Sequence, residues 1–372
     1  MNIGIDLRPL LSSVRTGVGE YTVELLNAVF ALPSSHDFFL FSNSWRDGVI
    51  QPQEWKKENI HFVSKHFPSK LLNSSLYLFQ FPKIDKLIGQ LDYFFSPNLG
   101  FQSLTLGCKH ILTVHDLSFE IEPKQFSRKR QLWHRVVRPR QQCEQAEKII
   151  TPSMATKRDI IKMYGVASEK IHVISPGLPA SFSVPTFDSE FVRRKYHLPS
   201  NFILTLGTIE PRKNLDTLLS AFQLFKMRTG SRIHLVVAGP RGWKNRQTLK
   251  TLRTLADVHE IGYVDSVDKP ALYRLAKLFV YPSLYEGFGL PVLEAMGSGV
   301  PVVTSAVSAL PEVGGGAVYY VNPDNVEDVY LALKRLLSNP SLLQRLHVDG
   351  LVQSKRFSWQ KSAHDFMALF AE

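Results

Sequence analysis

Short apolar runs rich in Ile, Val and Phe alternate with stretches of helical period along nearly the whole chain. This alternation is typical of parallel sheets whose two faces are covered by helices. The runs fall into two series, so the sequence predicts an α/β protein with two Rossmann-like domains. The first series comprises Asn2–Leu7, Asp37–Phe41, Ile60–Ser64, Tyr93–Ser96, His110–Val114, Lys148–Thr151 and Ile171–Ile174, and the second comprises Phe202–Leu206, His234–Ala238, Glu260–Val264, Leu278–Tyr281, Val300–Thr304 and Val318–Val321.

A segment that carries four prolines and has no clear helical period, residues 176–200, separates the two series. We interpret it as the linker between domains. A chain of 372 residues suits two domains of about 150 to 200 residues each. We therefore place a first domain at residues 1–180 and a second at residues 181–355.

Helical period is clear in Asn214–Met227 and Val326–Leu337, both within the second series. The last stretch, Pro340–Glu372, predicts two helices, of which the second begins near Ser358. We treat residues 356–372 as a separate C-terminal segment. Its apolar face consists of Phe366, Leu369 and Phe370.

Composition restricts the class of protein. Hydrophobic residues make up 44% of the chain and charged residues 21%, which is typical of folded domains and excludes a disordered chain. The two cysteines, Cys108 and Cys143, are too few for a metal cluster or a disulfide scaffold. Asp6 and Arg8 interrupt the apolar stretch that a signal peptide needs, and no apolar run reaches the roughly 18 to 20 residues that span a bilayer. We therefore expect a cytoplasmic protein.

The formal charge of +11 favours a polyanionic ligand or surface, but it does not distinguish nucleic acid, anionic lipid and a sugar nucleotide.

Two cations follow the first strand of the second series. Ligands of open parallel sheets bind beyond the carboxyl ends of the strands. The strand that ends at Leu206 continues into a loop with Arg212 and Lys213, directly before a helix opened by Asn214. Arg212 can grip two phosphate oxygens with its fork and Lys213 can add a point charge. The pair predicts a diphosphate site.

Two carboxylates and two glycines follow the strand that ends near Tyr281. Gly287 and Gly289 allow the backbone to approach a ligand closely, and Pro291 fits the first position of a short helix whose free N–H groups can meet an anion. Glu286 then lies in the loop and Glu294 about one turn into the helix. We interpret the two acids as groups that face bound hydroxyls.

Other glycines follow strands in both halves. Gly239 comes directly after a second-half strand, where a tight turn explains it as well as a ligand does. Gly17 and Gly19 come after the first strand and can bring amides to a phosphate. Thr22 occupies the position of the third glycine of a dinucleotide fingerprint, and no acid follows the next strand. This argues against NAD or FAD.

His115 and Asp116 follow a first-half strand. Such a pair at a strand end can hydrogen-bond a substrate hydroxyl, although an isolated His–Asp pair is more often structural.

Taken together, these features resemble the family 4 retaining glycosyltransferases over almost the whole chain. The most specific feature is the pair Glu286 and Glu294 with seven residues between them, around a Gly-Phe-Gly-Leu-Pro core. Supporting features are Arg212-Lys213, His115-Asp116, the Gly17/Gly19 loop, Thr151-Pro-Ser153, Ile174-Ser-Pro-Gly177 and Phe357-Ser-Trp359.

The resemblance implies a GT-B fold in which the first domain binds the acceptor, the second binds the nucleotide sugar, and the last helix packs back on the first domain. It implies no metal and no cofactor besides the donor. By the same mapping, Arg212, Lys213 and the amides around Gly289 and Leu290 stabilise the departing diphosphate. Glu286 and His115 hold the transferred sugar, and Glu294 accepts from the ribose hydroxyls. The remaining substrate-binding candidates are Gly17, Gly19, Asp116, Gly239 and Phe288.

The segments Gly4–Pro9 and Gly207–Asn214 are similar to a subset of the family that includes bacterial mannosyltransferases of surface-polysaccharide assembly. The resemblance implies a GDP- or UDP-linked donor, with GDP-mannose preferred, and a glycan or lipid-linked acceptor. One residue departs from the family pattern. Many members carry Arg directly after the glycine of that strand end, whereas Thr208 stands here, which leaves Arg212 to supply the charge.

A basic segment, Lys124–Arg140, carries seven Lys or Arg residues and no acid, interleaved with apolar side chains. It can bind the anionic lipids at the inner face of the cytoplasmic membrane, or it can be a solvated helix face.

Two other functions remain to be separated. A nucleotide-sugar epimerase of the same architecture would turn over without acceptor. A nucleic-acid-binding protein would suit the charge, but the aromatic residues do not form a stacking platform, so we expect no nucleic acid as partner.

Overall fold

The computed structural model describes residues 1–11, 17–44, 52–183 and 188–371. The chain divides into two compact units. The first contains residues 1–117, 128–177 and 359–372, and the second contains residues 118–127 and 178–358.

The first unit is built on a seven-stranded parallel sheet in the order β3-β2-β1-β4-β5-β6-β7. Side chains of successive residues point to opposite faces, and both faces are buried. Tyr93 and Phe95 thus enter one core and Phe94 enters the other. Its strands are β1 (Asn2–Asp6), β2 (Asp37–Asn43), β3 (Ile60–Lys65), β4 (Tyr93–Ser96), β5 (Lys109–Thr113), β6 (Lys148–Thr151) and β7 (Ile171–Val173).

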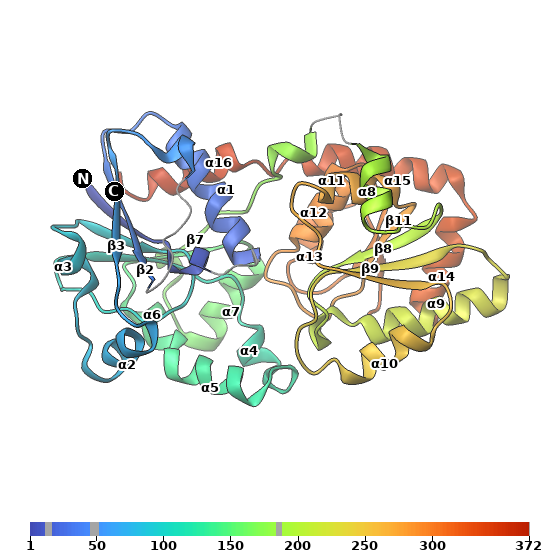
Figure 1. Ribbon diagram of the computed structural model, residues 1–372, viewed down its shortest axis with the longest axis horizontal. Helices are drawn as coiled ribbons and strands as arrows, with labels where there is room; N and C mark the ends of the chain where they lie inside the picture. The colour runs from blue at the N-terminus through green and yellow to red at the C-terminus, as the bar shows by residue number, and fades with distance from the viewer. Residues whose placement is uncertain (12–16, 45–51, 184–187, 372) are drawn as a thin grey trace. The chain divides into compact units, whose positions relative to one another are not determined.

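The helices of the first unit cover both faces of this sheet (Figure 1). The C-terminal helix packs beside the first helix, and its Phe366 is fully buried against Phe95. The predicted apolar face of the last helix is therefore confirmed. The helices are α1 (Gly17–Ala31), α2 (Ser69–Phe79), α3 (Ile84–Ile88), α5 (Arg128–Val137), α6 (Pro139–Gln145), α7 (Met154–Tyr164) and α16 (Trp359–Ala368).

The second unit is built on a six-stranded parallel sheet in the order β10-β9-β8-β11-β12-β13. Here too the strands alternate between two cores, with Leu204 in one and Ile203 in the other. Its strands are β8 (Phe202–Leu206), β9 (His234–Ala238), β10 (Val258–Gly262), β11 (Leu278–Tyr281), β12 (Val302–Ser305) and β13 (Tyr319–Val321). Its helices are α4 (Ser118–Ile121), α8 (Ser189–Lys195), α9 (Leu215–Thr229), α10 (Arg246–Thr254), α11 (Lys269–Leu275), α12 (Leu290–Gly297), α13 (Leu310–Gly314), α14 (Val326–Leu337) and α15 (Pro340–Ser354).

Two elements differ from expectation. The strand predicted at Glu260–Val264 is β10, two residues earlier, because Asp257 in a left-handed turn starts it and Gly262, with φ 73°, ends it. Part of the expected linker is the helix α8, whose Asp188 caps the first turn by accepting from Phe191 N. Only one of its residues is buried, so a helical period was not visible in the sequence.

The chain passes between the units at residues 177/178 and 358/359, and the short segment Ser118–Ser127 groups with the second unit. The sequence placed that segment in the first domain. Its attachment is aromatic: the ring of Phe126 stacks on Trp243 at 5.8 Å, and the Trp243 indole N–H donates to Gln125 O at 2.9 Å. In the described part of the chain, no helix is both long enough and apolar enough to cross a bilayer.

Candidate functional site

The predicted site residues of the second unit follow two adjacent central strands. In the sheet order, β8 and β11 are neighbours, and the later strands continue outward from them in opposite directions. In open parallel sheets, ligands bind at the carboxyl ends of the strands that flank such a switch point. Arg212 and Lys213 lie in a short 3₁₀ turn after β8, and Glu286 lies in the loop after β11.

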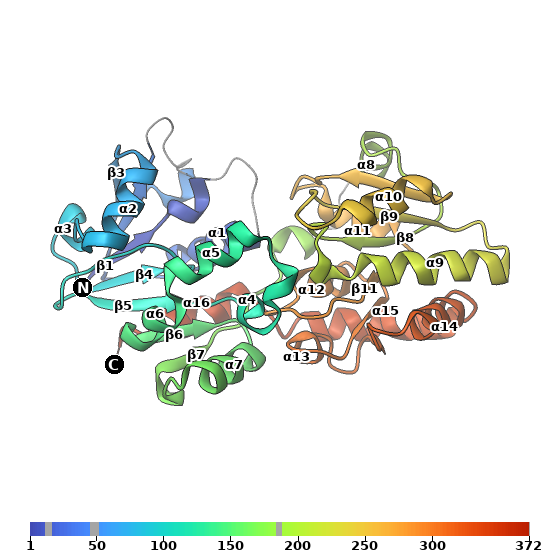
Figure 2. The same ribbon diagram turned by 90° about the horizontal axis from the view of Figure 1, so that it is seen from below.

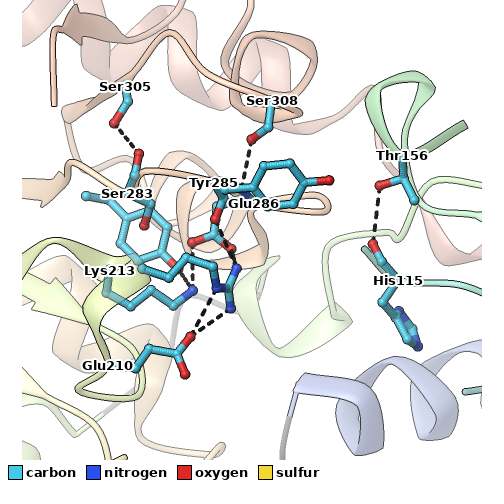
Figure 3. A network of polar contacts seen from close by, with 11 residues as sticks. His115, Thr156, Glu210, Lys213, Ser283, Tyr285, Glu286, Ser305 and Ser308 are labelled. Carbon is cyan, nitrogen blue, oxygen red and sulfur yellow. Dashed lines mark hydrogen bonds and ion pairs between the residues drawn. The ribbon is translucent and has the colours of Figure 1, made fainter. Parts of the chain in front are cut away.

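Arg212 and Lys213 converge on the carboxylate of Glu286. Figure 3 shows Lys213, Glu210 and Glu286 gathered in this cluster. Arg212 donates from Nη1 to Glu286 Oε2 at 2.8 Å and to the Tyr285 carbonyl at 3.0 Å. Lys213 donates from Nζ to Glu286 Oε1 at 2.7 Å and also contacts the Tyr281 hydroxyl. The structure thus brings together the two predicted cations and the first predicted acid.

A fourth charged group, Glu210, completes the cluster. Its Oε1 accepts from Arg212 Nε at 3.1 Å and from Nη2 at 2.9 Å. The two carboxylates therefore hold different edges of one planar guanidinium, which fixes its orientation. Sequence reasoning did not assign a role to Glu210, although it stands in the same loop as Arg212.

Pairing with the two cations keeps the Glu286 carboxylate ionised despite its burial. Burial alone would raise the pKa of Glu286, but Arg212 and Lys213 outweigh it and lower that pKa to about 2. Burial and the adjacent Arg212 lower the pKa of Lys213. The side chains of Arg212 and Lys213 are 17% and 16% exposed, against 7% for Glu286 and 4% for Glu210. The cations, and not the carboxylates, are therefore the more solvent-accessible part of the cluster.

Neighbouring loops hold the cluster in place. Asn214 stands at the N-cap of α9 in a left-handed conformation, and its side-chain amide donates to Pro282 O at 3.0 Å and to Pro323 O at 2.7 Å. It opens the helix as predicted, but its amide ties the loops after β11 and β13 to the loop after β8. Ser308 accepts from the Glu286 amide at 2.8 Å. No sequence signal identified Ser308, because the contact crosses from the loop after β12.

The helix α12 begins directly after the two glycines of the loop. Gly289 is its N-cap at φ 112°, and a Cβ atom there would lie 2.8 Å from Leu310 Cδ2, so glycine is required. Pro291 is the second residue of α12, one position after the predicted start of the helix, and it still stands in the first turn, where its missing N–H costs no hydrogen bond. The first N–H groups of a helix have no partner within it, so the amides at Gly289 and Leu290 can donate to an anion.

Glu294 has a separate set of polar partners. It is 4% exposed, accepts from the Tyr273 hydroxyl at 2.8 Å, and lies 3.6 Å from Lys269 Nζ. Both partners come from α11. The two acids of the Glu-x7-Glu pattern therefore have different partners, one in the loop cluster and one against a neighbouring helix.

Packing accounts for two further candidates. Phe288 is buried at 6% exposure and its ring lies 5.6 Å from that of Phe357. Gly239 has φ 128°, and a Cβ atom there would lie 2.1 Å from the Gly207 carbonyl oxygen. The close approach of two strand-end backbones thus requires glycine at 239 whether or not a ligand binds there. A role for either residue in substrate binding stays a prediction.

In the first unit, His115 is held at the carboxyl end of β5. Its Nε2 lies 2.8 Å from the Pro97 carbonyl, which follows β4, and its own carbonyl accepts from Thr156 Oγ1 at 3.3 Å (Figure 3). Burial lowers the pKa of His115, although the Pro97 carbonyl and the nearby Asp116 oppose the shift. A carbonyl can only accept, so the neutral ring carries its proton on Nε2 and presents Nδ1 as an acceptor.

The other first-unit candidates lie at the same end of the sheet. Asp116 is half-buried directly after His115, and the ring of Tyr21 in α1 meets the His115 ring edge-on at 4.7 Å. The start of α1 is thereby brought to His115. Gly17 is the first residue of α1, and a Cβ atom there would meet nothing within 4 Å. Gly19 is buried one turn before Thr22, whereas Thr16, which opens the predicted loop, lies outside the described residues.

Two family descriptions cover almost the whole chain. Residues 15–182 match the family described as Glycosyltransferase Family 4, and residues 188–350 match the one described as Glycosyl transferases group 1. The two matches meet near the point where the chain passes from the first unit to the second.

Individual relatives agree with these matches. The O-antigen chain mannosyltransferase B of Escherichia coli is 35% identical over 256 residues, which cover 67% of each chain. The serotype-specific mannosyltransferase WbdA of Escherichia coli is 34% identical over 59% of this chain, and the match spans 28% of WbdA. Among solved structures, Anabaena Alr3699/HepE in complex with UDP and glucose has a TM-score of 0.73 at 15% identity, covering 100% of this chain and 99% of that one. The fold is therefore that of the GT-B glycosyltransferases.

Proposed function

Since the chain belongs to the family 4 glycosyltransferases, we propose that it is a retaining enzyme that transfers mannose from GDP-mannose to a glycan or lipid-linked acceptor in surface-polysaccharide biosynthesis. The observation that carries the proposal is the buried cluster of Arg212, Lys213 and Glu286 at the switch point of the second sheet. Mannose and the polysaccharide are suggested by the names of the two relatives reported above, an O-antigen chain mannosyltransferase and a serotype-specific mannosyltransferase.

The cluster suits a diphosphate leaving group. When the bond between sugar C1 and the phosphate oxygen breaks, negative charge grows on that oxygen, and preorganised cations lower the energy of this transition state. Arg212 and Lys213 supply the charge, and the amides of Gly289 and Leu290 supply helix N–H donors. The acceptor hydroxyl oxygen bonds to C1 on the face from which the diphosphate leaves, and its proton passes to the departing phosphate oxygen.

The transferred sugar and the ribose are bound by side chains that accept hydrogen bonds from their hydroxyl groups. Nδ1 of His115 accepts from a sugar hydroxyl, and Glu286 accepts from another while it holds the two cations. Glu294 accepts from the ribose, which requires its carboxylate to exchange the Tyr273 hydroxyl for a ribose hydroxyl or to accept from both. Because protein cations neutralise the diphosphate, we propose that transfer needs no metal and continues in excess EDTA.

The setting of the reaction is part of the proposal. We place the enzyme in the cytoplasm, peripheral on the inner face of the membrane, with the basic segment Lys124–Arg140 against anionic lipid. Most of the cationic side chains of that segment are exposed, as the proposal needs.

The donor and the site can be tested together. Thermal shift with GDP-mannose, UDP-glucose and other nucleotide sugars should give the largest rise in melting point for GDP-mannose, because ligands that bind only the folded state stabilise it.

Lys213→Ala and Glu294→Ala should lower the rate of transfer by about 10²-fold or more. Lys250→Ala, an exposed lysine of α10, is the matched control and should transfer normally. Normal turnover in both site variants would refute the site, and product formation without acceptor would indicate an epimerase.

A further inference from the structure

We infer that α2 and α5 of the first unit together form a membrane-docking surface, in which apolar side chains of α2 enter the bilayer and cations of α5 meet anionic headgroups. This surface would explain how the enzyme reaches the membrane, and its biological role depends on the proposed function. Its evidence and its test are independent of the identity of the donor.

Exposed apolar side chains concentrate at α2. Leu71, Leu78, Phe79 and Phe81 are 68%, 65%, 75% and 66% exposed. Leu71 and Leu78 stand seven residues apart, so they lie on one side of the helix. On another side of α2, Leu72 and Leu76 are buried in the core. The helix is thus anchored by one side and presents large apolar groups on another, as interfacial helices do.

The second unit exposes large apolar residues in a different way. Its most exposed apolar side chains, those of Met227, Val267 and Val352, are 76%, 73% and 64% exposed and belong to α9, to a loop and to α15, where Val348, one turn from Val352, is 48% exposed. Scattered residues of this kind are ordinary, whereas a contiguous group marks an interaction site.

The helix α5 contributes cations and two more apolar groups. Leu132 and Trp133 are 58% and 39% exposed. Arg128, Lys129 and Arg135 of the same helix are also exposed. Tryptophan with flanking cations is typical of the boundary between headgroups and acyl chains.

Contacts join the two helices into one surface. Arg138, which directly follows α5, places its guanidinium 5.1 Å from the ring centre of Tyr77 in α2. Figures 1 and 2 show α2 and α5 as neighbours within the first unit. We call this the α2–α5 surface, and it comprises Leu71, Leu78, Phe79, Phe81, Leu132 and Trp133 with their flanking cations.

Charge identifies the occupant. Neither residues 67–81 nor residues 124–140 contain an acid. A second copy of the chain related by a two-fold axis would set cations against cations, which is unfavourable. Nucleic acid would satisfy the cations but not the aliphatic side chains. An anionic bilayer satisfies both groups, since its phosphates attract Lys and Arg and its acyl chains accept Leu and Phe.

The test is flotation of the full-length protein with vesicles of phosphatidylcholine alone and with added phosphatidylglycerol. Wild type should bind the anionic vesicles at least about tenfold more tightly than the neutral ones. Leu78→Ser combined with Phe79→Ser should weaken anionic binding by about tenfold or more without changing the charge. Lys129→Gln combined with Arg135→Gln should weaken it mainly at low salt.

Met227→Ser combined with Val352→Ser removes two comparably exposed apolar groups from the second unit and should bind vesicles like wild type. An unchanged melting point for each variant establishes that it folds. Wild-type affinity in the Leu78/Phe79 variant, or equal affinity for neutral and anionic vesicles, would overturn the inference. The inference would also be overturned if wild type formed a dimer and the Leu78/Phe79 variant dissociated that dimer while still binding vesicles like wild type. Failure of GDP-mannose to stabilise the protein would refute the proposed donor and leave the vesicle result standing.

Discussion

Glu210 acts on the proposed leaving-group site through Arg212. A guanidinium can rotate about several bonds, and each rotation would move the charge away from the diphosphate. Glu210 holds Nε and Nη2 while Glu286 holds Nη1, so both edges of the fork are fixed. The side chain of Glu210 is 4% exposed, which keeps water from competing for these hydrogen bonds. We therefore assign Glu210 as a positioning residue.

Replacing Glu210 should weaken donor binding more than acceptor binding. Glu210→Gln keeps one hydrogen-bonding oxygen but removes the charge, and it should raise the donor KM by about tenfold while leaving the acceptor KM unchanged. Glu210→Ala should lower kcat as well. The control is Glu327→Gln, which removes an exposed partner of Arg228 in α14. A donor KM that does not change in Glu210→Gln would show that Arg212 needs no orientation.

His115 provides a prediction of pH dependence. Burial lowers its pKa below the ordinary value of 6.5, so Nδ1 stays unprotonated at neutral pH and is lost as an acceptor only as pH falls through the lowered value. Transfer should therefore not lose activity through His115 between pH 8 and about 6.5. His115→Ala should lower kcat/KM by about 10², whereas His115→Asn, whose oxygen can replace Nδ1, should retain more activity. Equal losses in the two variants would contradict the acceptor role.

At the scale of elements, the strand pattern was the most predictable part of the molecule. Strands such as β8, β9 and β11 begin and end at the predicted residues, because their runs of Val, Ile, Leu and Phe are buried on both faces. The edge strand β10 was misplaced because all its residues are only half-buried. The short α8 was missed because a helix with one buried residue leaves no period to detect.

The contacts of the site were less predictable than its position. The switch point follows from strand order, and the candidate residues follow from what comes after each strand. However, the pairing of Arg212 with Glu286 joins residues 74 positions apart, and their distance depends on how β8 and β11 pair. Residue types alone could not reveal that the sugar-binding candidate Glu286 also forms ion pairs with both phosphate-binding cations.

The close approach of the backbones at the ends of β8 and β9 predicts that Gly239 cannot be replaced without loss of stability. Gly239→Ala would place a methyl group 2.1 Å from Gly207 O at a positive φ, so one of the strand ends must move. We expect a loss of about 2 kcal/mol or more in the free energy of unfolding, measured by urea denaturation. Gly107→Ala is the control, because a Cβ atom there meets nothing within 4 Å. A loss no larger than that of the control would contradict the close approach.

At the scale of the whole molecule, each unit has its own cores although neither is a continuous piece of chain. The first unit takes its last helix from residues beyond the second unit, and the second takes Ser118–Ser127 from within the first. Trp359, Phe366 and Phe370 belong to the first unit's core. A hydrogen bond from Ser362 Oγ to Ser175 O joins the last helix to a residue 187 positions earlier in the chain. The core of the first unit is therefore complete only after residues as late as Phe370 have been made.

This arrangement predicts that a destabilising substitution in the last helix lowers the stability of the first unit. Phe366→Ala deletes a fully buried ring against Phe95 and should cost about 3 to 5 kcal/mol. Hydrogen exchange should then quicken in β1 and β4 and stay unchanged in β8 and β11, because the cavity lies in the first unit's core. The matched variant Leu333→Ala, equally buried in α14, should produce the reverse pattern. If either variant accelerated exchange equally in both sheets, the two units would unfold as one cooperative body, and their separate cores would not be independent sources of stability.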